Sequence, residues 1–203
     1  MHISITGRLG SGKSTVAKLL AESEGFEIYS TGAIQRRIAA DMGLTTLQMN
    51  QLMNSDHKYD HMLDDTVTKI SLERAADTLL FDSRMAWHFA RGSFKVYLFV
   101  DTAVAARRVI RDCRGDVECY ASVDDAIEQL NARMLVENAR YRELYGVDHL
   151  DLNNFDLVVN TENISPEKTC EIIMSEFAKY CNSPDAYAHP CMFYMDGAVT
   201  SVK

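Results

Sequence analysis

The sequence predicts an α/β fold in which a parallel β-sheet is covered by helices on both faces. Five short apolar segments alternate with longer segments whose apolar residues recur at helical spacing. A glycine-rich segment, residues 7–14, lies between the first apolar segment and the first helical one. The chain has 203 residues, of which 47% are hydrophobic, so it is long enough for one well-buried core. We therefore expect one domain of three layers, with a five-stranded parallel sheet in the middle.

The glycine-rich segment matches the phosphate-binding pattern G-x-x-x-x-G-K-[ST] at every fixed position. Glycines let successive backbone N–H groups turn towards an anion, and the following helix N-terminus adds partial positive charge. Lys13 would reach the β- and γ-phosphates of a nucleoside triphosphate, and Ser14 would bind Mg²⁺, with Thr15 a weaker candidate. The alternative is a strand-to-helix turn that matches by chance. The residues predicted to bind the triphosphate in this P-loop NTPase fold are Gly7, Gly10, Ser11, Gly12, Lys13, Ser14 and Thr15.

Composition narrows the functional class. The formal net charge of −8 argues against a general nucleic-acid or membrane-surface binder, because both need broad positive fields. The longest apolar runs are far too short to span a bilayer, and the first residues do not resemble a signal peptide. The five cysteines show neither C-x-x-C nor zinc-ligand spacing, so we expect them to be reduced. These features predict a cytoplasmic protein.

The expected strands and helices follow from apolar spacing and capping residues. Gly25 and Gly146 are placed to end helices, and Ser122 and Ser165 to begin them. The expected strands are 2–6, 26–29, 78–84, 95–101 and 157–161, and the main helices are 13–23, 103–113, 122–145 and a last one that starts at 165.

A second phosphate site is predicted after the second strand. Ser30 and Gly32 lie in a polar turn that leads into a helix bearing Arg36 and Arg37 on its first turns. An anion site facing the P-loop is one interpretation, and an ordinary capped helix with solvated arginines is the other. Residues 33–78 are expected to form an entirely helical insertion in about three pieces.

The third strand ends in an acid and a base, Asp82 and Arg84. In open α/β sheets ligands bind beyond the carboxyl ends of the strands, so both side chains should reach the P-loop region. We expect Asp82 to bind Mg²⁺ and Arg84 to hold an acceptor's phosphate. A surface ion pair between the two is the alternative.

Arginines concentrate in residues 102–145, which hold seven of the chain's thirteen. Arg133, Glu137 and Arg140 share one face of the expected helix there. This face favours a lid that brings arginines onto transferring phosphates, and a solvated stripe of salt bridges is the alternative. Residues 182–203 have no clear period, so three alternatives stay open for this tail: docking on the core, homo-oligomer formation, or a loose segment.

The order of these elements resembles the P-loop nucleoside monophosphate kinases, and most closely the short cytidylate kinases and cytidylate kinase-like proteins. The resemblance covers roughly residues 1–180 and is carried by three stretches: Asp82–Trp87, Arg140–Asp148 and Phe155–Thr161. The sequence departs from the family pattern at Ser83, where glycine is usual, and at Met134 and Leu135, where acidic residues are more frequent.

The resemblance implies transfer of the γ-phosphoryl group of MgATP to a nucleoside monophosphate, CMP or dCMP above others. It implies that Arg36 and Arg84, beside Ser30 and Gly32, bind the acceptor. Arg133 and Arg140 would close over the phosphates together with Lys13, and Arg108 would join them at the nucleotide. Another phosphorylatable small molecule, or a regulatory role in nucleotide binding, stays open. The implied division is a core of 1–32, 79–113 and 146–181, an acceptor-binding insertion of 33–78 and a lid of 114–145.

Overall fold

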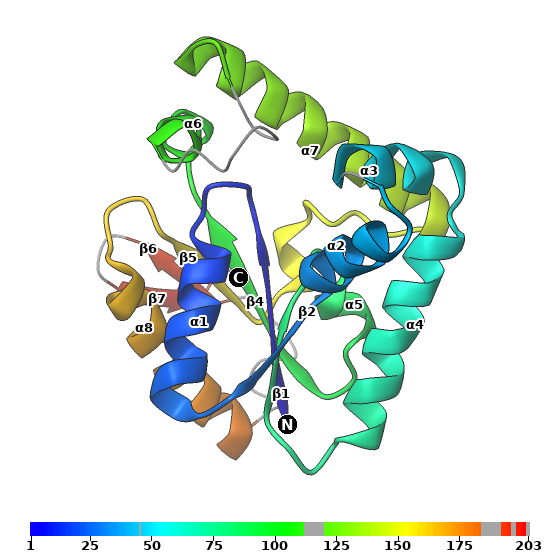
Figure 1. The fold of residues 1–203 in the computed structure, drawn as a ribbon. Coiled ribbons are helices and arrows are strands. Elements are labelled where there is room, and N and C mark those ends of the chain that lie inside the picture. Colours follow the sequence, from blue (N-terminus) through cyan, green and yellow to red (C-terminus); the bar gives the residue numbers. More distant parts are fainter. Residues whose placement is uncertain (45, 112–119, 184–191, 196–197, 202–203) are drawn as a thin grey trace.

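A single sheet forms the centre of the molecule. The computed structural model describes residues 1–203 except 45, 112–119, 184–191, 196–197 and 202–203. In the described residues the strand order is β2-β3-β1-β4-β5-β6-β7 (Figure 1). The strands are β1 (His2–Gly7), β2 (Glu27–Ser30), β3 (Leu79–Asp82), β4 (Ser93–Phe99), β5 (Leu157–Asn160), β6 (Met192–Met195) and β7 (Ala198–Ser201).

The five-stranded parallel sheet predicted from the sequence is confirmed, since β1 to β5 all pair in parallel. The tail extends this sheet by two strands that the sequence analysis did not predict. Strand β6 pairs in parallel with β5, and β7 pairs antiparallel with β6. Tyr194 of β6 is 7% exposed and belongs to the main hydrophobic core. The tail therefore docks on the core, while self-association through it stays a prediction.

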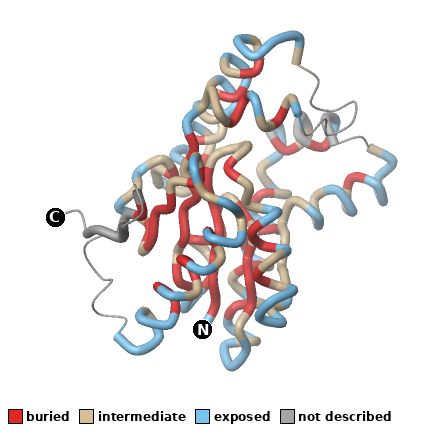
Figure 2. The backbone as a smooth tube through the Cα atoms, turned by 90° about the vertical axis from the view of Figure 1, so that its left-hand side faces the viewer, coloured by how far each residue is buried: buried red, intermediate tan, exposed pale blue. Residues whose placement is uncertain are grey.

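Helices α1 (Lys13–Glu24) and α8 (Pro166–Asn182) cover one face of the sheet (Figure 1). Their apolar stripes pack on the strand residues that point to that face, such as Val96 and Leu98. Tyr97, between these two, points to the opposite face, as the two-residue period of a strand requires. Figure 2 shows the buried strands as the interior of the molecule, with exposed helix surfaces around them.

On the opposite face, α5 (Ala86–Phe89) and the C-terminal half of α7 (Val123–Tyr145) supply a second core. Trp87 and Tyr141 pack there with Tyr97 of β4 and Phe155. The start of α7 is capped by Ser122, whose hydroxyl accepts a hydrogen bond from the Asp125 N–H at 3.1 Å. The sheet is therefore the middle of three layers, as predicted.

The insertion consists of three helices: α2 (Thr31–Asp41), α3 (Thr46–Ser55) and α4 (Lys58–Glu73). It has a small core of its own, in which Ala39, Met49, Met53 and Leu63 are buried. Helix α4 also packs on the sheet, because Val67 contacts the core formed by Leu79 and Phe81.

The lid region begins after α6 (Thr102–Arg111), which packs against the first half of α7 through Ala106, Val109 and Leu130. Arg114, one of the seven clustered arginines, lies outside the described residues. No helix among the described residues is both long and apolar enough to cross a bilayer.

Candidate active site

The P-loop connects β1 to α1 at the carboxyl edge of the sheet. Gly7 has φ +143°, and a Cβ atom there would lie 2.2 Å from the backbone oxygen of Leu98 in β4. No side chain can be accommodated at this distance, so the close packing of β1 on β4 requires glycine. The loop closes on itself, because the Ser11 N–H donates to the Arg8 carbonyl at 3.2 Å.

Lys13 is the first residue of α1, and its ammonium lies over the loop. The Nζ atom donates to the backbone oxygens of Gly7 at 2.8 Å and Arg8 at 2.9 Å. The loop's own carbonyls thus hold the ammonium beside the helix N-terminus, where backbone N–H groups favour an anion. Contact of Lys13 with phosphate stays a prediction.

Asp82 lies at the end of β3, in register with Ile5 of β1 and Ser30 of β2. Burial raises the pKa of its carboxyl group, and four neighbours oppose this rise. The opposing groups are the charges of Lys13, Arg84 and Arg36 and a hydrogen bond with Ser14. The structure therefore brings together the predicted metal, triphosphate and acceptor residues around one carboxylate.

The predicted metal ligands fit Mg²⁺ in kind. The Ser14 hydroxyl and the Asp82 carboxylate are hard oxygen donors in mutual contact. Among the described residues no group of three or more His, Cys, Asp or Glu side chains could hold a metal. Mg²⁺ is usually bound by one or two protein oxygens together with water and phosphate oxygens, and binding of Mg²⁺ by Ser14 and Asp82 stays a prediction.

The residues predicted for the acceptor lie at the start of α2. The Ser30 hydroxyl caps this helix by accepting a hydrogen bond from the Ala33 N–H at 3.4 Å. A Cβ atom at Gly32 would be 3.5 Å from Nη1 of Arg36 and 3.9 Å from the Ser30 hydroxyl oxygen. Ser30, Gly32 and Arg36 are therefore neighbours beside Asp82.

Arg84 pairs with a carboxylate of the lid. Its guanidinium forms an ion pair with Glu137 of α7, which also pairs with Nε of Arg133 at 3.0 Å. The Arg84 and Glu137 side chains are only 24% and 12% exposed. The alternative of a surface ion pair between Asp82 and Arg84 does not describe this site, because Arg84 pairs with Glu137.

Arg140, the third residue of this helix face, contacts the insertion. Its Nη2 atom lies 3.5 Å from the Asp60 carboxylate of α4, and its guanidinium carbon is 5.3 Å from the ring centroid of Tyr141. The Arg140 side chain is 18% exposed. A solvated stripe of salt bridges does not describe Glu137 and Arg140, which are 12% and 18% exposed, although Arg133 on the same face is 41% exposed. Contact of Arg133 and Arg140 with phosphate stays a prediction.

Arg108 of α6 braces the P-loop. Its guanidinium donates to the carbonyls of Gly10 at 3.3 Å, Thr161 at 2.7 Å and Glu162 at 3.1 Å. These bonds join the loop to the segment after β5. A direct contact with nucleotide stays a prediction, and the bracing role is a function of Arg108 that the sequence did not indicate.

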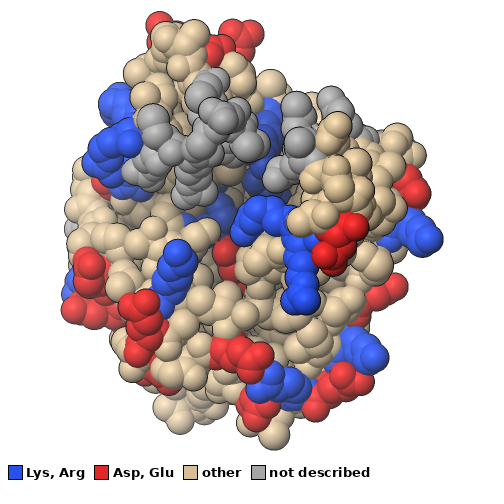
Figure 3. Space-filling view, viewed as in Figure 1, with Lys and Arg blue, Asp and Glu red and all other residues tan. Residues whose placement is uncertain are grey.

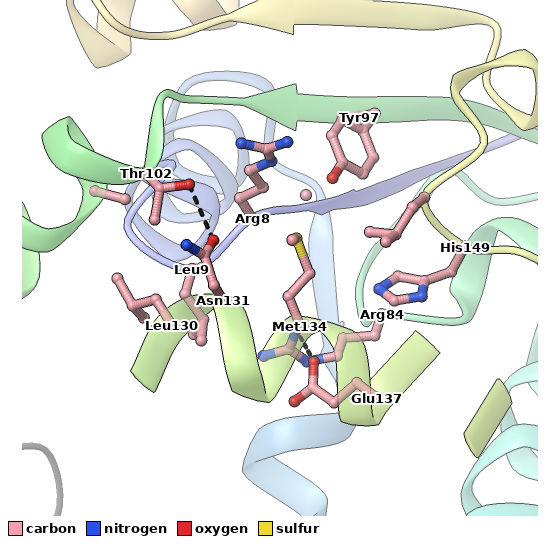
Figure 4. Close-up of a pocket in the computed structure, with 13 residues that line it drawn as sticks. Arg8, Leu9, Arg84, Tyr97, Thr102, Leu130, Asn131, Met134, Glu137 and His149 are labelled. Carbon is pink, nitrogen blue, oxygen red and sulfur yellow. Dashed lines mark hydrogen bonds and ion pairs between the residues drawn. The ribbon is translucent and has the colours of Figure 1, made fainter. Parts of the chain in front are cut away.

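A pocket lies between the P-loop, β4, α6 and α7, and Figure 4 shows Arg84 and Glu137 at one side of it. Polar residues of this pocket that the sequence analysis did not single out include Arg8, Tyr97, Asn131 and His149. Arg8 lies within the P-loop pattern at a position that accepts any residue, and its guanidinium carbon is 4.4 Å from the Phe99 ring centroid. The other three come from separate elements, so no sequence spacing links them.

His149 is neutral in this pocket. Burial, reinforced by the charge of Arg84, lowers its pKa to about 4 against the opposing charges of Glu137 and Asp148. The Nδ1 atom is 2.8 Å from the side-chain oxygen of Asn138, an acceptor, so the ring proton lies on Nδ1. Nε2 is therefore left as an unprotonated acceptor.

Charged side chains are unevenly distributed over the surface of the molecule. On the face in Figure 3, several Lys and Arg side chains lie around the centre of the view, and acidic side chains lie at the top, on the right and over the lower half. In a chain of net charge −8, this local concentration of Lys and Arg favours binding of an anion there.

Comparison with known proteins agrees with this geometry. The sequence model of the cytidylate kinase-like family matches residues 2–163. The chain belongs to this family. Relatives named cytidylate kinase include that of Natronomonas pharaonis, which is 36% identical over 91% of this chain and 93% of its own. The cytidylate kinase of Sulfolobus acidocaldarius is 34% identical over 88% of this chain and 95% of its own.

Solved structures with the same fold include shikimate kinase from Bacteroides thetaiotaomicron and an uncharacterized protein from Eubacterium ventriosum. The first has a TM-score of 0.59 at 13% identity, covering 88% of this chain and 98% of its own. The second has a TM-score of 0.64 at 16% identity, covering 90% and 99%. At these identities the likeness shows the P-loop kinase fold alone.

Proposed function

We propose that the chain is an ATP-dependent nucleoside monophosphate kinase that transfers the γ-phosphoryl group of MgATP to CMP or dCMP. The observation that carries the proposal is the convergence of Ser14, Lys13, Arg84 and Arg36 on Asp82. A P-loop lysine and two arginines beside one carboxylate suit two phosphates held next to each other. The names of the relatives support cytidine as the acceptor's nucleoside.

The residues suit a reaction that needs charge neutralisation and alignment. The attacking oxygen belongs to a phosphate that is already ionised, so no side chain has to remove a proton. Lys13 would neutralise the transferring phosphoryl group, while Arg36 and Arg84 would hold the acceptor phosphate in line with it. Arginine suits this task because its planar guanidinium binds two oxygens at once and stays charged.

Mg²⁺ would neutralise the charge on the β- and γ-phosphates. Ser14 and Asp82 would hold it, Asp82 at least partly through water. Closure of the lid and the insertion would exclude water from the transferring group. Contacts that already join these two regions, such as Arg140 with Asp60, favour their movement together.

A coupled assay of ADP release tests the proposal, with MgATP and a panel of CMP, dCMP, UMP, AMP, GMP and shikimate. We expect turnover with CMP or dCMP well above that with the others. Lys13→Ala should lower it by about a thousandfold, the size of effect typical for loss of one such charge contact. Lys18→Ala, on the exposed side of α1, is the control.

Other outcomes separate the alternatives. Turnover with shikimate alone would identify a kinase of the same fold with another acceptor. Tight ATP binding with no acceptor-dependent turnover would instead identify a nucleotide-binding regulator. Turnover near wild type in Lys13→Ala would contradict the site assignment itself.

A further inference from the structure

Glu137 is an acid in the middle of an arginine cluster. Its carboxylate pairs with Arg84, from the end of β3, and with Arg133, one turn earlier on α7. The Glu137 and Arg84 side chains are 12% and 24% exposed, so their contact is largely shielded from water, whereas Arg133 is 41% exposed. In Figure 4 the side chains of Arg84 and Glu137 point towards one another between the core and α7. This is the contact by which the lid helix holds Arg84.

The Glu137 carboxylate is ionised. Burial would raise its pKa, but the charges of Arg84, Arg133 and Arg140 outweigh burial and lower the pKa below its usual value. An anion held by two guanidinium groups is also the arrangement expected for a bound phosphate monoester. Arg84, which the proposed function assigns to the acceptor phosphate, is therefore already occupied by an anion from the chain itself.

We propose that Glu137 stands in for the acceptor phosphate in the resting protein and must be displaced from Arg84 and Arg133 when the acceptor binds. This inference rests on the proposed function and adds a regulation of that same site. A phosphate monoester can displace the carboxylate because it carries up to twice the charge and offers three oxygens to the guanidinium groups.

The contact has a consequence for ATP that is bound without an acceptor. In futile hydrolysis, water attacks the γ-phosphorus and the bond to the β–γ bridging oxygen breaks. ADP, inorganic phosphate and one proton are then released. Arg133, which is expected to close over the phosphates, and Arg84, beside the transferring group when no acceptor is bound, would accelerate this reaction as they accelerate the productive one. By neutralising Arg84 and Arg133 until an acceptor arrives, Glu137 limits the loss of ATP to water. It acts through the arginines, so it is a positioning residue.

The test compares Glu137→Gln with wild type in two measurements. Calorimetric titration with CMP, without ATP, should show binding at least about threefold tighter in the variant. A factor of three corresponds to an Arg84 that is paired about two-thirds of the time in wild type. Hydrolysis of MgATP without acceptor should rise about tenfold, the change expected when about 1.4 kcal/mol of transition-state stabilisation is regained.

Two further variants complete the test. Glu137→Asp keeps the charge on a shorter side chain that cannot span both arginines, so its hydrolysis should lie between those of wild type and Glu137→Gln. Glu137→Asp also serves as the test variant if Glu137→Gln does not fold. Glu128→Gln removes an exposed carboxylate from the same helix and should match wild type in both measurements.

The proposal is overturned if Glu137→Gln binds CMP more weakly and hydrolyses ATP no faster than wild type. Glu137 would then contact the acceptor directly. A failure of the proposed function is a separate result, because it would appear as a wild-type protein that turns over no nucleoside monophosphate.

Discussion

Tyr145 donates a hydrogen bond to the Asp64 carboxylate at 2.6 Å, which ties the last turn of α7 to the middle of α4. Asp64 is 8% exposed, and Asp60, one helical turn away, is 5% exposed. Two buried carboxylates thus lie where the lid helix meets the insertion, with Arg140 close to one of them. These contacts join the two regions, and the charge of the two carboxylates depends on pH.

The free energy of unfolding should fall as the Asp64 carboxyl group at this junction ionises. Burial raises the pKa of Asp64 from 3.8 to about 6, against smaller opposing effects of the Tyr145 hydrogen bond and nearby cations. The native state therefore binds more protons than the unfolded state between these values, so the free energy of unfolding decreases as pH rises through them. A shift of this size corresponds to roughly 3 kcal/mol.

Asp64→Asn removes this titration and keeps an oxygen that can accept from Tyr145. We expect the variant to exceed wild type in stability by a margin that grows from pH 4 to pH 7, measured by urea denaturation. Asp65→Asn, an exposed neighbour on the same helix, is the control. Parallel pH profiles of Asp64→Asn and wild type would contradict the assignment. Burial also raises the pKa of Asp60, and its contribution remains in both proteins.

Gly7→Ala should prevent close pairing of β1 with β4. The added Cβ would meet backbone atoms of Leu98, which cannot move without breaking the strand pair. We expect a loss of about 3 to 5 kcal/mol in the free energy of unfolding, in the range of severe backbone strain and overpacking. Gly25→Ala, at φ +71° with no atom within 4 Å of the added Cβ, should cost about 1 kcal/mol. Equal losses in the two variants would show that the approach to β4 tolerates a side chain.

The sequence predicted the sheet, its five parallel strands and the convergence of Lys13, Asp82 and Arg36 because these depend on local patterns. A strand has a two-residue period, a cap lies next to its helix, and parallel strands place their carboxyl ends at one edge. The P-loop lies at the carboxyl end of the first strand. The residues at the carboxyl ends of the other parallel strands are therefore expected at the same edge of the sheet.

The partners of Arg84 and Arg108 could not be predicted from the sequence. Arg84 and Glu137 are 53 positions apart, and no spacing rule relates the end of a strand to the middle of a distant helix. No pattern in the sequence distinguished Arg108 from its neighbour Arg107, although Arg108 donates to the Gly10 carbonyl and Arg107 is exposed. The tail strands were missed for a related reason: residues 192–201 show no alternation strong enough to predict pairing at the edge of an existing sheet.

Arg36→Lys should weaken binding of the acceptor more than that of ATP. Arg36 neighbours Ser30 and Gly32 beside Asp82, and lysine cannot reproduce a guanidinium that binds two phosphate oxygens. We expect the KM for CMP to rise about tenfold, which corresponds to loss of one charged hydrogen bond, with little change in the KM for ATP. Arg37→Lys, at the next position and also exposed, should behave as wild type. A rise confined to the KM for ATP would place Arg36 at the donor instead.

Arg108→Met should weaken ATP binding by loosening the P-loop. The guanidinium joins the Gly10 carbonyl to the carbonyls of Thr161 and Glu162, and methionine keeps the apolar stem but none of these bonds. A loop whose backbone N–H groups are no longer held in place binds phosphate less well, because ATP must then order it. We expect the KM for ATP to rise about tenfold, at a cost of about 1 to 2 kcal/mol in the free energy of unfolding. Arg107→Met, exposed on the same helix, should change neither quantity. If Arg108 instead contacts the nucleotide directly, the KM for ATP will rise while the unfolding free energy stays at the wild-type value. Measuring both quantities on the same preparation therefore separates bracing from direct contact.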